Sequence, residues 1–195
     1  MVVAIMGLLA SVAIPNFIKY QGRSKQSEAK TTLKGYFIAQ RSYAAEAGTY
    51  TEKLTAVGFA PERGNRYAYL ATLAPAAWEG RAAQAATRPA GIEGIEVDCF
   101  KLGGSGCTPR PPRPSPVGFS VGYDTGSSGP SDTGVVAGSS GGFVVEARGS
   151  VDNDSESDTW VLSSGSISVT DVTCGEAGNY GAGAPVNVYN DVACP

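Results

Sequence analysis

The sequence predicts an α+β fold in which one long N-terminal helix packs on a small antiparallel sheet of about four strands. Two observations lead to this prediction. The first 18 residues carry no charge, whereas the rest of the 195-residue chain is polar and rich in glycine. A helical repeat of apolar residues then continues to Ala47, and only short stretches with strand-like alternation follow it. We expect residues 1–48 to form the helix and residues 49–195 to form a globular head.

The first half of the predicted helix, residues 1–18 (MVVAIMGLLASVAIPNFI), is apolar enough to lie in a membrane. A helix of this length extends about 27 Å, close to the thickness of the hydrocarbon core of a bilayer. Four residues make it less apolar and easier to break than a permanent anchor: Gly7, Ser11, Pro15 and Asn16. The pattern therefore favours an anchor that can leave the membrane. A secretory signal peptide fits less well, because no basic region precedes the apolar run.

The second half of the helix, residues 19–47, carries an apolar stripe on one face. Its members recur at steps of three and four residues, as in an amphipathic helix, and are Ala29, Leu33, Phe37, Gln40, Ala44 and Ala47. Gln40 is the one polar member, and Tyr36 and Tyr43 flank the stripe. The charged residues fall mostly off it: Lys25, Lys30, Lys34, Arg41 and Glu46. Gly48 is the predicted end of the helix.

Alternating apolar residues predict the strands of the head. These stretches lie at 66–73, 117–123, 142–148, 160–162 and 167–172. Between the first two, the proline-rich segment 108–116 (TPRPPRPSP) is expected to be extended, since proline fixes the backbone and has no amide hydrogen. A small sheet needs a second layer to bury its apolar side. We expect the helix to supply that layer through Leu33, Tyr36, Phe37 and Tyr43.

The composition excludes much of enzyme chemistry. The chain has no histidine, so it cannot contain a Ser-His-Asp triad, a histidine general base or a histidine-ligated zinc. Gly138, Ser140 and Gly142 match the GxSxG nucleophile pattern, but we interpret this Ser/Gly stretch as a loop. We therefore expect no catalytic residue and no cofactor. The net charge of −3 and the pI of about 5.0 give no indication of a specific nucleic-acid surface.

Two segments of the chain resemble type IV pilins. Residues 7–30 (GLLASVAIPNFIKYQGRSKQSEAK) are similar to the helix shared by pilins and pseudopilins. Residues 58–67 (GFAPERGNRY) resemble the major type IVa pilins of gliding delta-proteobacteria such as myxobacteria. The resemblance implies the type IV pilin fold. It also implies that this chain begins about seven residues after the mature N-terminus of the family. None of the family's processing residues can therefore be assigned.

The chain contains four cysteines, an even number without the CxxC spacing of metal sites: Cys99, Cys107, Cys174 and Cys194. This pattern favours disulfides formed in an oxidising compartment, and the sequence alone allows three pairings. We favour the local pairs, Cys99–Cys107 and Cys174–Cys194. The second would close a Gly- and Asn-rich loop at 174–194 with little apolar content, which such a bridge stabilises by about 3 kcal/mol. The resemblance implies that this terminal loop is an exposed surface.

One acidic segment, residues 152–158 (DNDSESD), alternates carboxylates as the start of a calcium-binding loop does. The candidate ligands are Asp152, Asp154, Glu156 and Asp158. The glycine and the distant bidentate glutamate of an EF-hand are missing, and acidic clusters of this kind commonly form turns before a strand. We interpret the segment as a turn, with calcium as the alternative that the resemblance to pseudopilins adds.

The resemblance implies a structural subunit, without enzymatic activity, that polymerises into a retractable extracellular pilus filament for motility or adhesion. Its expected partners are other copies of the pilin, the inner membrane before assembly, and the pilus assembly machinery. The residues expected to assemble the filament are Met1, Val2, Val3, Ile5, Met6, Leu8, Leu9, Val12, Ile14 and Phe17. Because Pro15 removes a helical hydrogen bond and Gly7 is a poor helix former, we expect the helix between them to unwind partly in the filament. In an isolated subunit we expect Pro15 at least to kink the helix.

Three alternative functions are open at this point. A type II secretion pseudopilin would share the helix and use the acidic turn for calcium. An electron-conducting filament would use an aromatic path of Phe17, Tyr20, Tyr36, Phe37, Tyr43 and Tyr50, although packing accounts for these residues without it. A single-span anchored binding domain is the third. The basic residues of the helix are interpreted as its solvated side or as partners of acidic residues on neighbouring subunits: Lys19, Arg23, Lys25, Lys30 and Lys34.

Overall fold

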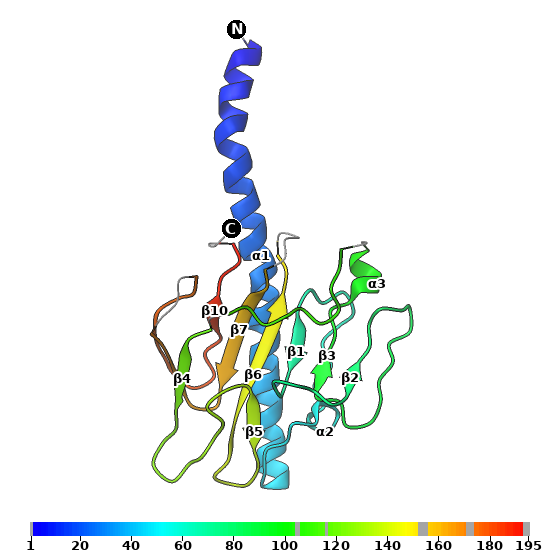
Figure 1. Ribbon diagram of the computed structural model, residues 1–195, viewed down its shortest axis with the longest axis vertical. Helices are drawn as coiled ribbons and strands as arrows, with labels where there is room; N and C mark the ends of the chain where they lie inside the picture. The colour runs from blue at the N-terminus through cyan, green and yellow to red at the C-terminus, as the bar shows by residue number, and fades with distance from the viewer. Residues whose placement is uncertain (1, 104–105, 116, 152–155, 171–173, 193–195) are drawn as a thin grey trace.

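A long helix passes behind a β-sheet and extends well beyond it at the N-terminal end (Figure 1). The computed structural model describes residues 2–103, 106–115, 117–151, 156–170 and 174–192. The helices are α1 (Val2–Ala47), α2 (Leu54–Val57) and α3 (Cys99–Leu102). The strands are β1 (Ala68–Leu70), β2 (Trp78–Glu79), β3 (Gly94–Ile95), β4 (Phe119–Gly122), β5 (Gly134–Val136), β6 (Gly142–Gly149), β7 (Asp158–Ser163), β8 (Ser166–Val169), β9 (Gly178–Tyr180) and β10 (Val186–Tyr189).

The helix ends where the sequence predicts. Gly48 adopts a left-handed backbone with φ of +69°, and its amide donates a hydrogen bond of 2.9 Å to the carbonyl of Ala44. An L-residue with a side chain is strained in this conformation, which is why glycine commonly ends helices. The chain then turns back along the helix through α2 and enters the sheet at β1 (Figure 1).

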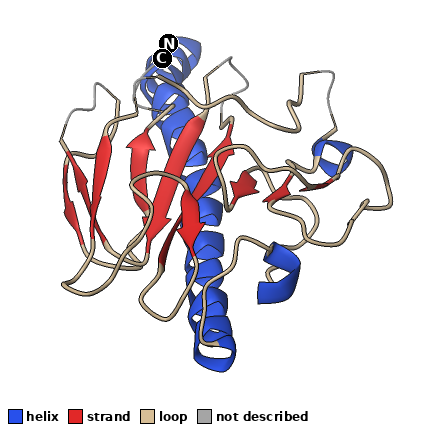
Figure 2. Ribbon diagram, turned by 60° about the horizontal axis from the view of Figure 1, so that its bottom comes forward, coloured by secondary structure: helices blue, strands red, loops and turns tan. Residues whose placement is uncertain are grey.

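Two sheets form the head. The larger has the order β10-β7-β6-β1-β3-β2, with β5 also paired to β6, and all its pairs are antiparallel except β2 with β3. The smaller sheet has the order β4-β8-β9 and is antiparallel. The fold class is therefore confirmed as α+β. Helix α1 covers one face of the larger sheet (Figure 2).

The main core lies between α1 and the larger sheet. Alternate residues of β6 and β7 point to the helix, as the two-residue period of a strand requires. The buried members of this core include Leu33 and Tyr36 from α1, Tyr67 and Tyr69 near β1, and Phe143, Val145, Trp160 and Leu162 from β6 and β7. A second core lies on the other face of β7, where Val161 packs with Ile167, Val169, Val186 and Val188. Strands β6 and β7 are thus buried on both faces.

The predicted helix stripe is largely correct. Ala29, Leu33 and Gln40 are fully buried, as is Tyr36, which was expected to flank the stripe and to pack on the sheet. Gln40 donates hydrogen bonds through Nε2 to the hydroxyl of Tyr36 and to the carbonyl of Thr51, while its buried Oε1 has no partner among the described residues. At the end of the helix Ala47 is exposed, because the sheet no longer covers the last turn.

The sheet is larger than the predicted four strands. The additional strands are two to four residues long, and several contain glycine, so they lack the run of alternating residues on which a strand prediction depends. The terminal segment is also more ordered than predicted. Val186 and Val188 of β10 are fully buried, and β10 pairs with β7, so this segment is held by the sheet and not by a disulfide alone.

Candidate functional site

The N-terminal half of α1 presents apolar side chains to solvent. Val2, Met6, Leu9, Ile14 and Phe17 are each 59–67% exposed, and this part of the helix stands clear of the head (Figure 1). A contiguous exposed apolar surface of this kind marks an interaction site in a folded protein. Of the other predicted assembly residues, Val3, Ile5, Leu8 and Val12 lie on the same helix, and Met1 lies outside the described residues.

Within the described residues, no helix combines the length and the mean hydropathy that a membrane span requires.

The backbone is helical through both predicted weak points. Helix α1 is continuous from Val2 to Ala47, and Gly7 and Pro15 both lie within it. An added Cβ at Gly7 would meet no atom within 4 Å, so no contact within the subunit requires glycine there. The predicted unwinding concerns the filament and stays a prediction, as does the kink at Pro15.

Asp158 joins the helix to the sheet. Its carboxylate is fully buried and accepts four hydrogen bonds. The donors are Gln26 Nε2 at 2.9 Å, Tyr67 OH at 2.6 Å, Trp160 Nε1 at 2.6 Å and Asn187 Nδ2 at 3.0 Å. Burial raises the pKa of Asp158, although these hydrogen bonds act against it. One carboxylate therefore connects α1, β7, β10 and the segment that leads into β1.

The predicted calcium ligands are not brought together in the described chain. Asp152 and Asp154 lie outside the described residues, Asp158 uses both its oxygens inside the core, and Glu156 accepts a hydrogen bond of 2.8 Å from Tyr189. Among the residues that the structure describes, no group of three or more potential ligands could hold a metal ion. Calcium at this segment stays an untested expectation.

A buried arginine fixes the loop at residues 61–65. Arg81 is 2% exposed and donates to the carbonyls of Pro61 at 2.8 Å and Glu62 at 2.9 Å, and to Asn65 Oδ1 at 2.6 Å. Its charge is balanced by Glu79, whose Oε1 lies 2.6 Å from Arg81 Nη2. This network could not be predicted from the sequence, because its members are spread over the 21 positions from Pro61 to Arg81 with no local pattern.

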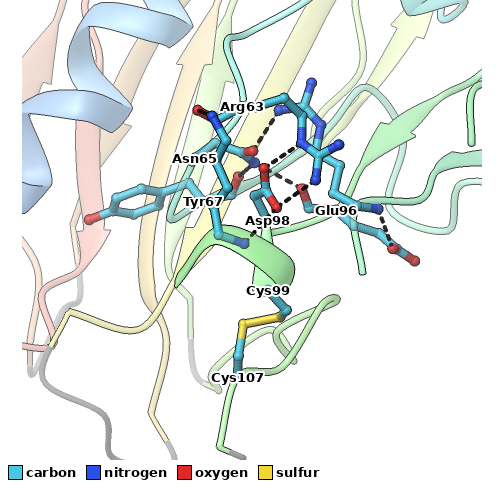
Figure 3. Close-up of a disulfide and its surroundings, with 9 residues drawn as sticks. Arg63, Asn65, Tyr67, Glu96, Asp98, Cys99 and Cys107 are labelled. Carbon is cyan, nitrogen blue, oxygen red and sulfur yellow. Dashed lines mark hydrogen bonds and ion pairs between the residues drawn. A yellow bond between two sulfur atoms is a disulfide. The ribbon is translucent and has the colours of Figure 1, made fainter. Parts of the chain in front are cut away.

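The disulfide Cys99–Cys107 anchors the neighbouring segment (Figure 3). It confirms the first of the predicted pairs and closes α3 against the following loop. Asp98 precedes Cys99 as the N-cap of α3 and accepts from the amide of Lys101. The guanidinium of Arg63 also bonds to Asp98, through Nη2 to Oδ1 at 2.8 Å. This bond is the main reason that the pKa of Asp98 is lowered to about 2.

The second predicted disulfide involves Cys194, which lies outside the described residues, so Cys174–Cys194 stays a prediction. The backbone at Cys174 does lie beside the later part of this segment. The amide of Asn190 donates a hydrogen bond of 2.5 Å to the carbonyl of Cys174.

Two other sequence features have packing roles. Ser140 of the GxSxG match lies in a turn between β5 and β6, where the amide of Gly141 bonds to the carbonyl of Gly138 at 3.1 Å. Tyr36, Phe37 and Tyr50 of the aromatic path all contact Phe143, with ring centroids 5.4–5.8 Å apart. These rings are part of the main core, so packing explains them.

The amino-acid sequence that forms this long helix and its covering sheet matches a known protein family. The model of the type IV pilin PilA family matches residues 20–158. The type IV major pilin protein PilA of Myxococcus xanthus (strain DK1622) is 43% identical over 198 aligned residues, which cover 99% of this chain and 89% of the relative. The chain belongs to the type IV pilin PilA family. It is a structural subunit of a type IV pilus, and its family implies homopolymeric assembly into an extracellular filament. The alternative functions are not favoured.

Proposed function

We propose that this chain polymerises through the exposed apolar half of α1 into a retractable filament that serves motility or adhesion. The observation that supports the proposal is the apolar surface formed by Val2, Met6, Leu9, Ile14 and Phe17 on the N-terminal half of α1, which stands clear of the head (Figure 1). Burying each such side chain contributes about 1.5–3 kcal/mol. Several of them per copy supply enough free energy to hold a polymer together without a covalent bond.

Before assembly the same apolar half would lie in the inner membrane. The support for this step is the absence of any charge in the first 18 residues. Transfer from lipid to a bundle of identical helices keeps the apolar side chains out of water. The step therefore needs no chemistry on the subunit, and a mechanical motor can drive it. We propose accordingly that the chain itself is not an enzyme and that its partners are the pilus assembly machinery and other copies.

The test is the yield of filaments sheared from cells that express single variants of the full chain. Leu9→Asp places a charge on the exposed apolar surface and should abolish filaments, since an unpaired charge in an apolar interface is costly. Leu73→Asp is the matched control, because Leu73 is 44% exposed but belongs to the head. Normal filaments from the Leu9 variant would overturn the proposal.

A further inference from the structure

The charges of the chain are distributed unevenly between helix and head. Residues 19–47 contain six of the 15 basic residues and two of the 18 acidic residues, which leaves nine basic and 16 acidic residues in the head. The helix is therefore positive and the head negative. Opposite charges on two parts of one polymerising subunit favour contacts between the helix of one copy and acidic groups of the next.

Five of the helix cations form one stripe. We call them the basic stripe: Lys19, Arg23, Lys30, Lys34 and Arg41, all of which are exposed. At 100° per residue they fall within an arc of roughly 60° around the axis of α1. Lys30 lies over the ring of Trp160 at 4.7 Å, and Arg41 contacts the hydroxyl of Tyr50 at 3.5 Å. In the described chain no ion pair includes Lys19, Arg23 or Lys34.

An acidic pocket lies on the opposite flank of the same helix. This Glu28 pocket has a volume of about 270 Å³ and is lined by Glu28 and Thr32 of α1 and by residues 61–65. It is smaller than the pockets that take drug-sized ligands, and it suits a single side chain. Glu62 at its edge is exposed. Arg81 holds the carbonyls of Pro61 and Glu62, so the wall of the pocket is fixed by a buried network.

The charges in the pocket are not balanced within the subunit. Glu28 Oε1 accepts from the amide of Arg66 at 2.9 Å and from Tyr69 OH at 3.3 Å, but no ion pair in the described chain includes Glu28. The guanidinium of Arg63 is hydrogen-bonded to Asp98. The more distant charge of Arg66 only weakly favours the ionised form of Glu28. Burial outweighs these contacts and raises the pKa of Glu28. A cation from outside would complete the site.

We propose that a cation of the basic stripe on one copy enters the Glu28 pocket of a neighbouring copy. The proposal rests on the proposed polymerisation. The stripe and Glu28 lie roughly 150° apart around α1, so one copy cannot satisfy its own pocket. Two different surfaces that meet head to tail generate an open chain of contacts unless the rotation between copies closes a ring. The ionic contact therefore repeats from copy to copy and sets the register in which the apolar helix halves pack.

The first test is zero-length carbodiimide cross-linking of sheared filaments, followed by peptide mapping. Carbodiimide joins a carboxylate to an amine only when the two are in contact. We expect links from Glu28 or Glu62 to one of the lysines of the basic stripe, Lys19, Lys30 or Lys34. In a single copy the pocket and the stripe lie on opposite flanks of α1, so such a link reports a contact between copies. Cross-linked filaments in which none of these links is found would overturn the proposal.

The second test is charge reversal with filament yield as the readout. Glu62→Lys should lower the yield by about tenfold or more, since it sets like charges against each other. Glu46→Lys is the matched control, because Glu46 is exposed like Glu62 but lies on α1, outside the pocket. Combining Glu62→Lys with Arg23→Glu or Lys34→Glu should restore part of the yield. Equal yields from the Glu62 and Glu46 variants would contradict the contact.

The conservative variant Glu28→Gln separates charge from folding. The amide oxygen of glutamine can still accept from Arg66 and Tyr69, while the negative charge is lost. We expect folded subunits, with an unchanged unfolding transition, whose filaments release subunits at lower salt than the wild type. If the wild-type chain formed no filament, the proposed function would fail; if it formed filaments that none of these variants affects, only the ionic contact would fail.

Discussion

Tyr67 donates its hydroxyl hydrogen to Asp158 across 2.6 Å, although the two residues are 91 positions apart in the sequence. The contact is buried and ties the start of the sheet to its centre. Because Gln26 of α1 and Asn187 of β10 bond to the other oxygen of the same carboxylate, four parts of the chain depend on one side chain.

Replacing Asp158 by asparagine should destabilise the head by about 2–3 kcal/mol, since the amide nitrogen would face donors that now bond to an oxygen. Urea denaturation, followed by tryptophan fluorescence, measures the change. Asp124→Asn serves as the control because Asp124 is exposed, and it should leave the midpoint unchanged. Equal midpoints for the two variants would show that Asp158 is not the centre of this network.

Loss of the Cys99–Cys107 disulfide should lower the free energy of unfolding by about 2.5 kcal/mol in the chain-entropy model, given a sequence separation of 8 residues. Cys99→Ser together with Cys107→Ser makes the test without leaving a free thiol.

Peptide mapping of unreduced filaments tests the second predicted disulfide: we expect a peptide in which Cys174 is joined to Cys194. A Cys107–Cys174 bridge would contradict both pairings.

The ion pair between Arg63 and Asp98 should make stability depend on acid pH. The pKa of Asp98 is about 2 in the folded chain, below the value near 3.9 of an unfolded chain. Its contribution is therefore complete above about pH 5 and is lost as the pH falls toward 2. Arg63→Gln should lower the free energy of unfolding at pH 7 and lower it clearly less at pH 2.5. Lys34→Gln, a control without an ion pair in the described chain, should show no such pH dependence.

Two glycines of α1 should respond in opposite directions to the same substitution. A Cβ at Gly22 would lie 2.7 Å from Cγ2 of Val192, whereas one at Gly35 would meet no atom within 4 Å. Gly35→Ala should stabilise the subunit by up to about 1 kcal/mol through helix propensity. Gly22→Ala should gain less or destabilise it, because Val192 must move. Thermal unfolding of both variants gives the comparison, and an equal gain at the two sites would contradict the close packing.

The helix between Gly7 and Pro15 should be partly non-helical in the filament. Pro15 has no amide hydrogen to donate to the preceding turn of the helix, and neighbouring helices can bury an extended stretch that lipid would not tolerate. A map of the native filament tests this directly. Unbroken helical hydrogen bonds from Ala4 to Phe17 would exclude the unwinding and leave membership of the pilin family unaffected.

The features that could be predicted from the sequence are those that depend on near neighbours. The helix length follows from the spacing of Ala29 and Leu33 and from Gly48, all within one element. The two-residue strands β2 and β3 could not be predicted, since they exist only because Gly94 pairs in space with Trp78 on one side and with Leu70 of β1 on the other. Asp158 was interpreted as part of an acidic turn, because its partners lie far away in the sequence. One local signal was available: Asp158 precedes Trp160 by two residues and so shares its face of the strand.

The pairing of β10 with β7 has a consequence for the order in which the head can form. Until residues 186–189 have been delivered, β7 is an edge strand with one side of its backbone open, and such edges pair readily with other chains. The head can form most of its sheet early, but the six-residue β7 is covered only at this late step, when the shorter β10 replaces it at the edge. A chain released before residue 186 would keep the exposed helix and gain an exposed edge, and so would aggregate instead of joining a filament.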